Sequence, residues 1–254
     1  MKSIIKTLFF IIALLVNMQL ASCAGSGNND GNKHGIRGRF VNYTVLKDIA
    51  DTIPGGIPAY CFEMNFVSDD SVELSNGFED YKLAYTKNEG SYLLLEASFK
   101  GNMPFTFIND STLLLIDTAW TNNAFNSEFR KVHDNKQQNW VFDYYLNQVI
   151  VVGEYTLYNK NIPLPQKVVF KADGHVSGLD NYTTYSICYS GDCIGETIPP
   201  SNTITLSDNS GKAIDFAFKI NKKNKALSIY KIEAPVEDVK GEMAIKEMLY
   251  ELKK

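Results

Sequence analysis

The chain has 254 residues, of which 44% are hydrophobic, 12% aromatic and 21% charged, with a formal net charge of −4. This apolar and aromatic content excludes an intrinsically disordered chain. The acidic balance argues against nucleic acid as a partner, because neutralising a phosphate backbone takes clustered Lys and Arg. Four cysteines are too few for a disulfide-stapled scaffold. At about 100 to 150 residues per domain, the length allows one large domain or two small ones.

The N-terminal segment 1–22 has the pattern of a signal peptide. A positively charged start precedes the apolar run Leu8–Val16, which is too short for the roughly 30 Å hydrocarbon core, since a spanning helix takes about 20 residues. The run closes on Leu20–Cys23, which resembles the lipobox of bacterial lipoproteins. The resemblance implies that Cys23 is the first mature residue and is acylated with chains such as palmitate. The alternative is an ordinary secretory signal followed by a chance cysteine.

The next segment, 23–36, is rich in Gly and Asn, a composition that cannot bury a core and behaves as a flexible tether. Ala24 follows the cysteine, and under the enterobacterial sorting rule the absence of an acid there favours the outer membrane. We therefore expect a lipid-anchored protein of the cell envelope, with the membrane as a partner through Cys23.

Two stretches of the remaining chain align without a gap, which indicates an internal duplication. They are 66–85 and 170–189, and the matched pairs are Phe66 with Phe170, Asp69 with Asp173, Val72 with Val176, Tyr81 with Tyr185, and Tyr85 with Tyr189. The flanks extend the match, because Gly38–Phe40 resembles Gly153–Tyr155, and Glu128–Lys131 resembles Glu251–Lys254. We predict one repeat over 37–134, a junction over 135–152 and a second repeat over 153–254.

Inside each copy, apolar residues alternate with polar ones at a period of two, which is typical of half-buried strands. The predicted strands are separated by residues that are typical of turns, such as Asn76-Gly77 and Ser207–Gly211. Short strands at hairpin spacing predict an all-β fold of two tandem small antiparallel β-barrels.

Three segments depart from this pattern. The insertion around Asp48–Ile53 is expected to hold one helical turn, and Trp140–Val151 a short packed helix in the junction. At the C-terminus, 236–254, propensity favours a helix, whereas repeat symmetry favours a closing strand. We predict a strand for the last eight residues.

The stretch Phe170-x-x-Asp173-Gly174-x-Val176-x-Gly178 resembles the hairpin of calycin/lipocalin-like and META-type small barrels. Many lipoproteins of Bacteroidota carry such domains after a lipobox. The first copy departs from the motif, with Asp70 in place of the first glycine and Leu74 in place of the second. The resemblance implies a fold class and not an activity.

The sequence contains no recognisable catalytic or metal-binding motif. The hydrolase elbow Gly-x-Ser-x-Gly, His-Glu-x-x-His, the Walker loop and GxGxxG are all absent. His34, His133 and His175 are not brought together by any pattern, and Asp69-Asp70 is expected to be a pair of solvated turn acids. We therefore expect no catalytic residue, no metal and no cofactor.

The cysteines other than Cys23 have separate predicted roles. Cys188 and Cys193 bracket a predicted hairpin loop, where they form a local disulfide in an oxidising envelope; metal binding and free thiols are the alternatives. Cys61 lies between aromatic residues and is expected to be a buried small apolar side chain.

The tyrosines of the two copies either fill the cores or face a ligand at a barrel mouth or junction cleft. They are Tyr81, Tyr85, Tyr182, Tyr185 and Tyr189. Our first hypothesis is a non-catalytic binding lipoprotein that holds a small apolar or glycan ligand. The alternative is a structural lipoprotein whose filled barrels dock an envelope protein. A third class, an envelope hydrolase, needs two acids or an Asp–His pair converging in a cleft.

Overall fold

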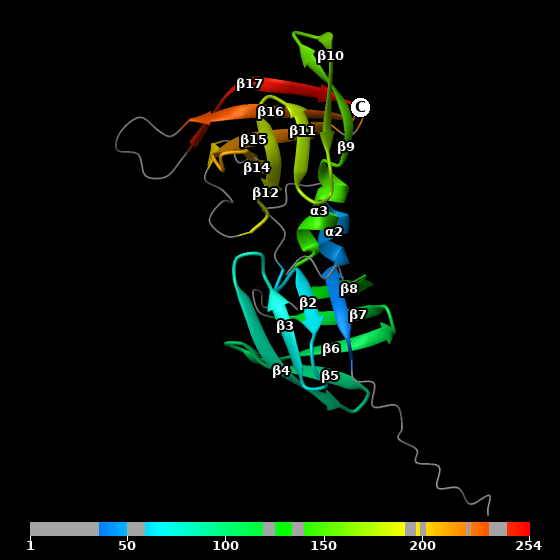
Figure 1. Cartoon of the computed structure of the whole chain (residues 1–254). Helices are drawn as coiled ribbons and strands as arrows, with labels where there is room; N and C mark the ends of the chain where they lie inside the picture. Colours follow the sequence, from blue (N-terminus) through cyan, green and yellow to red (C-terminus); the bar gives the residue numbers. More distant parts are fainter. Residues whose placement is uncertain are drawn as a thin grey trace, which may run out of the picture. The chain divides into compact units, whose positions relative to one another are not determined.

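The fold is known from a computed structural model of the chain (Figure 1). Residues 1–35, which hold the predicted signal peptide, Cys23 and most of the predicted tether, lie outside the residues that the structure describes, and so does Cys193. Those described residues are 36–49, 59–118, 125–133, 140–190, 197–198, 202–221, 223, 225–233 and 243–254.

The first repeat is a closed eight-stranded antiparallel barrel in which each strand pairs with the next and β8 returns to β1. One helix, α2 (Tyr43–Ile49), lies between the first two strands. The strands are β1 (Gly38–Asn42), β2 (Glu63–Phe66), β3 (Ser71–Ser75), β4 (Asp80–Asn88), β5 (Ser91–Ser98), β6 (Gly101–Asn109), β7 (Thr112–Asp117) and β8 (Phe125–Val132).

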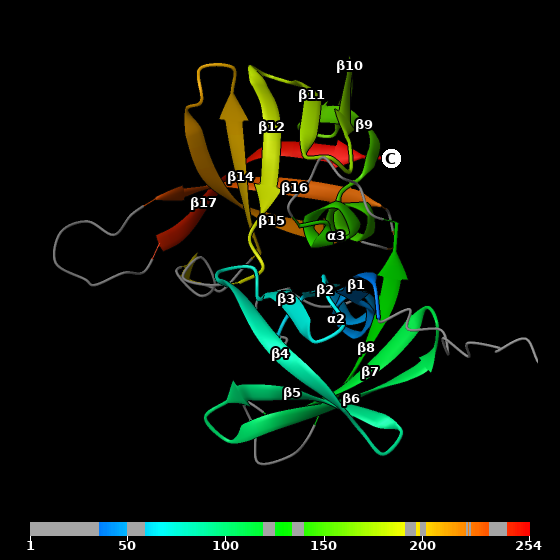
Figure 2. The ribbon, with the colours of Figure 1, turned by 60° about the horizontal axis from the view of Figure 1, so that its bottom comes forward.

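The second repeat is a barrel of the same kind, entered through helix α3 (Phe142–Ile150) and closed by pairing of β17 with β9 (Figure 2). A two-residue strand, β13 (Thr197–Ile198), adds to β17 in parallel. The barrel strands are β9 (Gly153–Asn159), β10 (Ile162–Phe170), β11 (His175–Leu179), β12 (Tyr182–Ile187), β14 (Asn202–Asp208), β15 (Ala213–Asn221), β16 (Ala226–Glu233) and β17 (Met243–Lys253). The prediction of two tandem antiparallel barrels is confirmed.

The described part of the C-terminal segment forms the strand β17, Met243–Lys253, as repeat symmetry predicted. Leu252 is fully buried opposite Leu227 of β16, and the same stretch of β17 also pairs with β9. Pairing on both edges supplies backbone hydrogen bonds and apolar burial that outweigh the helix propensity of the sequence.

Helix α2 begins earlier than the expected turn around Asp48. The Val45 N–H donates to Asn42 Oδ1 at 3.1 Å, so Asn42 caps the helix, and Val45, Leu46 and Ile49 are buried. The cap is the last residue of β1, and the sequence pattern there indicated only a strand. Helix α3 lies within the range where a junction helix was expected.

Both barrel interiors are filled by side chains. In the first, Phe66, Tyr85 and Phe105 are each at most 5% exposed and lie with ring centroids 5.4 to 5.9 Å apart. In the second, Phe170 has Tyr185 edge-on at 5.1 Å and Tyr155 at 5.9 Å. An eight-stranded barrel is just wide enough for its own side chains or one small ligand, and here aromatic rings occupy that space.

The duplication is visible in the structure, but the ungapped alignment is wrong beyond the β3–β4 turn. Tyr85 lies edge-on to Phe66 and donates its hydroxyl hydrogen to the Ser68 carbonyl at 3.0 Å. Tyr185 makes the same ring contact with Phe170 and donates to the Lys171 carbonyl at 2.6 Å. The structural partner of Tyr85 is therefore Tyr185, where the alignment had Tyr189.

The physical reason is a change in hairpin length. Residues 76–79 connect β3 to β4, whereas 180–181 connect β11 to β12, and the β11–β12 pairing also shifts register within His175–Leu179. A shorter turn and an irregular pairing move every later residue relative to its partner in the first copy.

The first and last strands of the two barrels match as predicted. Gly38 and Gly153 have φ of +109° and +151°, and a Cβ at either position would lie within 3 Å of a lysine Cε, that of Lys131 or Lys254. Each lysine ammonium then lies over the aromatic ring two residues after its glycine, at 5.9 Å and 5.0 Å from the centroid. The positive φ favours glycine at both positions, whereas the lysine ends that a Cβ would meet are flexible and could move aside.

Gly178→Ala is expected to destabilise the second barrel strongly. Gly178 has φ +75°, and a Cβ there would lie 1.9 Å from the Lys167 carbonyl oxygen. Gly211 has a similar φ, +82°, but a Cβ added there would meet no atom within 4 Å, so Gly211→Ala isolates the conformational cost of about 1 to 2 kcal/mol. Urea denaturation should show Gly178→Ala losing at least about 2 kcal/mol more than the control. Equal losses would contradict the close approach.

Candidate functional site

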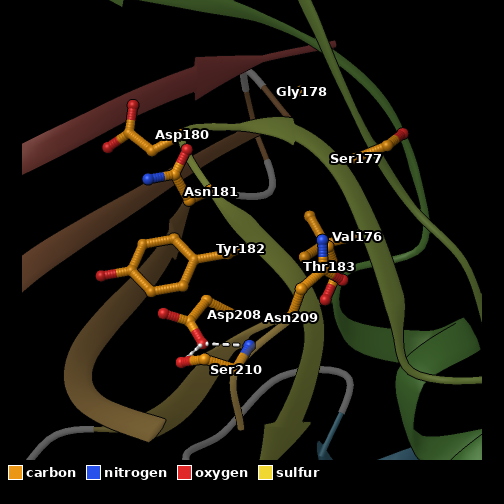
Figure 3. A pocket seen from close by; sticks show the side chains of 10 residues that line it. All are labelled: Val176, Ser177, Gly178, Asp180, Asn181, Tyr182, Thr183, Asp208, Asn209 and Ser210. Carbon is orange, nitrogen blue, oxygen red and sulfur yellow. Dashed lines mark hydrogen bonds between the residues drawn. The ribbon is translucent and has the colours of Figure 1, made fainter. Parts of the chain in front are cut away.

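Described residues of the second barrel line two clefts that lie outside the packed interior. The larger, which we call the rim cleft, has a volume of about 540 Å³ and opens between the β11–β12 turn and the β14–β15 turn (Figure 3). Its lining is mostly polar: Val176, Ser177, Gly178, Asp180, Asn181, Tyr182, Thr183, Asp208, Asn209 and Ser210.

The carboxylates of the rim cleft are held by the local structure. Asp208 Oδ1 accepts hydrogen bonds from the N–H and the hydroxyl of Ser210 at 2.8 and 2.6 Å, and from the Lys212 N–H at 3.1 Å. These bonds, the Ser210 hydroxyl first, lower the pKa of Asp208, so it carries a negative charge at neutral pH. Asp180, in the left-handed region at φ 45°, accepts a hydrogen bond from the Tyr250 hydroxyl.

Tyr182 is the aromatic residue of the rim cleft. Its ring packs edge-on against Phe216 at 5.9 Å, and Figure 3 shows it between Asn181 and Asp208. Burial, followed by the charges of Asp180 and Asp208, raises the pKa of Tyr182, so the hydroxyl stays protonated at neutral pH. The cleft thus combines one aromatic ring with carboxylate, amide and hydroxyl groups.

The other tyrosines considered from the sequence have different positions. Tyr85 and Tyr185 are buried core residues, although Tyr185 also borders the second cleft. Tyr81 lies edge-on to Tyr60 with centroids 6.0 Å apart. Tyr189 packs on Phe62 and Phe142 at 4.9 and 5.1 Å, where the first barrel meets α3. Of the five, Tyr182 is the one that the structure places in the rim cleft.

A buried carboxylate joins the first barrel to α3. Glu63 of β2 is fully buried, and its Oε2 accepts hydrogen bonds from the N–H groups of Val141 and Phe142 at 2.7 and 2.9 Å. Arg39 Nη1 lies 3.4 Å from its Oε1. Burial raises the pKa of Glu63 to about 7. The two N–H groups and the charge of Arg39 act in the opposite direction and lower this pKa, but burial has the larger effect.

The cysteines and histidines form no catalytic or metal centre within the described part of the chain. No group of three or more His, Cys, Asp and Glu side chains there is placed to hold a metal ion. Cys61 is fully buried and burial raises its pKa, while Cys188 is disulfide-bonded; its predicted partner Cys193 lies outside the described residues, so that pairing stays a prediction.

Asp173 and His175 do lie together, with Oδ1 3.1 Å from Nδ1, but both side chains are at least half exposed in a turn. The described helices include none long and apolar enough to cross a membrane.

The fold and the clefts define a tandem eight-stranded β-barrel protein with its accessible sites on turns and on a helix. No protein-family model, curated protein or solved structure matches the chain.

Several residues of these sites were not found from the sequence. Asn181, Asp208 and Ser210 have the composition of ordinary turns, and Glu63 sits in a strand with no local sign of burial. The one available signal was Tyr182, which follows a turn with two polar residues.

Glu63→Gln should remove a pH dependence of stability between pH 5 and 8. A folded pKa near 7 against an ordinary value of 4.5 means that the folded state holds the proton more tightly. Its contribution is fully present below pH 4.5 and is lost as pH rises through 7, a change of about 2 to 3 kcal/mol. The free energy of unfolding of wild type minus variant, from urea melts, should fall by that amount. A flat difference curve would contradict the raised pKa.

Proposed function

We propose that this protein is a non-catalytic binding lipoprotein of the bacterial cell envelope that holds a carbohydrate chain in the rim cleft. The observation that carries the proposal is the Tyr182 ring set among carboxylate, amide and hydroxyl groups in a cleft open to solvent.

Carbohydrate binding uses this combination of an aromatic ring and polar groups. A sugar ring has an apolar C–H face, which packs on an aromatic ring, and a rim of hydroxyls, which need paired donors and acceptors. Asp208 and Asp180 supply acceptors, while Asn181 and Asn209 supply both donors and acceptors. An open cleft suits a chain that enters and leaves along the surface, since it does not need to enclose the ligand.

The filled barrels argue against a small apolar ligand inside them. Phe66, Phe105 and Phe170 are each at most 2% exposed and occupy the interiors in close ring contacts. Most side chains of the rim cleft are polar, with Tyr182 and Val176 as its larger apolar groups, so it suits a ligand with many hydroxyls better than a purely apolar one. Of the two ligand classes expected from the sequence, the geometry supports the glycan.

Attachment to the membrane rests on the sequence around Cys23. A bacterial lipoprotein N-terminus carries several acyl chains, and stable anchoring by lipid takes more than one chain. The Gly- and Asn-rich segment 23–36 then gives the barrels reach from the membrane surface.

A second candidate function is docking of an envelope protein. The first barrel exposes large apolar side chains near its hairpin turns, with Phe99 87%, Phe78 66% and Ile108 60% exposed. Phe78 and Phe99 lie at turns on the same end of this barrel, whereas Ile108 lies at the other end, so Phe78 and Phe99 are the candidates for an interaction surface. Cross-linking in cells separates the two functions, because docking requires one recurring protein partner and carbohydrate binding does not.

Tyr182→Leu should weaken carbohydrate binding while preserving the fold. Leucine keeps an apolar contact with Phe216 but loses the flat ring, so binding to the best oligosaccharide from a glycan array should weaken at least about tenfold in titration calorimetry. Tyr182→Phe tests the hydroxyl alone. Tyr230→Leu, on the same barrel and outside the cleft lining, is the matched control. Absence of any glycan ligand, or equal weakening by the control, would overturn the proposal.

Cys23→Ala should prevent lipid attachment and release the protein from the membrane fraction. In a bacterial host fed an alkyne-bearing fatty acid, the wild-type chain should take up the label and sediment with membranes. Cys61→Ala is the control, because Cys61 is buried in the first barrel and should leave labelling unchanged. Unlabelled wild-type protein would show that segment 1–22 is an ordinary secretory signal.

A further inference from the structure

The second cleft, which we call the helix cleft, lies between α3 and the parts of the second barrel that face it. It has a volume of about 290 Å³. Helix α3 and the residue Trp140 before it supply Trp140, Asp143, Tyr144, Leu146 and Asn147, and the barrel supplies Ala172, Asp173, Gly174, Tyr185, Ser186 and Ile187.

The walls of the helix cleft are held in place by hydrogen bonds to both barrels. The Trp140 indole N–H donates to Asp80 Oδ2 of the first barrel at 2.6 Å. Asn147, which is 5% exposed, donates from Nδ2 to the Ala172 carbonyl at 3.0 Å and ties α3 to the turn after β10. The aromatic side and the acidic side of the cleft are therefore built parts of the fold.

The lining combines aromatic rings with acids and contains no Lys, Arg or His. Trp140 and Tyr144 are the rings on the helix side, and Asp143 and Asp173 are the carboxyl groups. Burial acts to raise the pKa of Asp173, but hydrogen bonds from His175 and the charge of Lys171 lower it overall, so Asp173 is ionised at neutral pH.

The charged side chains in the lining of the helix cleft, Asp143 and Asp173, are both acidic. Partial burial raises the pKa of Asp143, and the Tyr189 hydroxyl opposes that rise by hydrogen bonding to it. The N-terminus of α3 would ordinarily attract an anion, but Glu63 already accepts its first N–H groups. His175 and Lys171, which lower the pKa of Asp173, are not part of the cleft lining.

We propose that the helix cleft binds an organic cation, a ligand carrying an alkylammonium or quaternary ammonium group. Aromatic faces attract such cations through their ring quadrupole, and they do so without the full dehydration cost of a small inorganic ion. The Trp140 and Tyr144 rings contact the methyl or methylene groups around the nitrogen, and Asp173 balances the charge. This site is separate from the rim cleft, so either proposal can fail without the other.

The test compares choline with its neutral isostere, 3,3-dimethyl-1-butanol, using the full-length protein in detergent. The two probes have the same shape and differ in the charge at the quaternary centre. Titration monitored by NMR and by Trp fluorescence should show choline binding at least about fivefold more tightly, the effect of a cation–π contact worth about 1 kcal/mol.

Three variants assign the binding to this cleft. Tyr144→Leu and Asp173→Asn should each weaken choline binding at least about threefold, and Trp140→Phe should weaken it less because phenylalanine keeps an aromatic face. Tyr230→Leu, outside the lining of both clefts, should leave it unchanged. The proposal would be overturned if the two probes bound with equal affinity, or if no choline bound at about 50 mM, which is 50 times the expected Kd of about 1 mM. It would also be overturned if Tyr144→Leu melted like wild type and bound choline as tightly.

Discussion

The carboxylate of Glu63 is the interaction that unites the two halves of the structure. It comes from β2 of the first barrel, is fully buried, and accepts hydrogen bonds from the N–H groups of Val141, the N-cap of α3, and Phe142, its first residue. Helix α3 in turn buries Phe142 and Leu146 in the core that contains the second barrel. A carboxylate removed from water is costly unless its hydrogen bonds are good, so this contact favours one geometry of the junction over looser ones. The helix cleft depends on it directly, because α3 forms one of its walls.

The two copies keep the same interior and differ in their turns. Phe66 with Tyr85 and Phe170 with Tyr185 are the same contact built twice, with the same hydroxyl-to-carbonyl bond. The turn 180–181 is shorter than its counterpart, and its polar side chains line the rim cleft together with Asp208 at the end of the paired strand β14. Sites on turns held by a rigid barrel are the usual arrangement, because a turn tolerates change that a filled core does not.

The fold was predictable because both of its signals are local. Alternation at a period of two marks strands from their own residues, and a duplication is visible by comparing the chain with itself. The site was not predictable in the same way. Glu63 is recognisable only once α3 is docked against it, and Asp208 and Asn181 are typical of any solvated turn. Even the alignment of the tyrosines failed at the hairpin where the two copies differ in length, because matching residues by sequence offset assumes equal turns.

Because aromatic side chains fill both barrels, the second copy provides additional surface and not a ligand chamber. An eight-stranded barrel can hold one small ligand, but the Phe and Tyr rings that stabilise these cores remove that volume. Emptying either core would lose several kcal/mol per large aromatic side chain, so a barrel of this size cannot readily have both a stable interior and a ligand chamber. A second copy therefore adds surface: one more set of turns and, at the junction, a helix whose N-terminus the first copy binds. Both clefts lie on that added surface, where binding groups are introduced without cost to the cores.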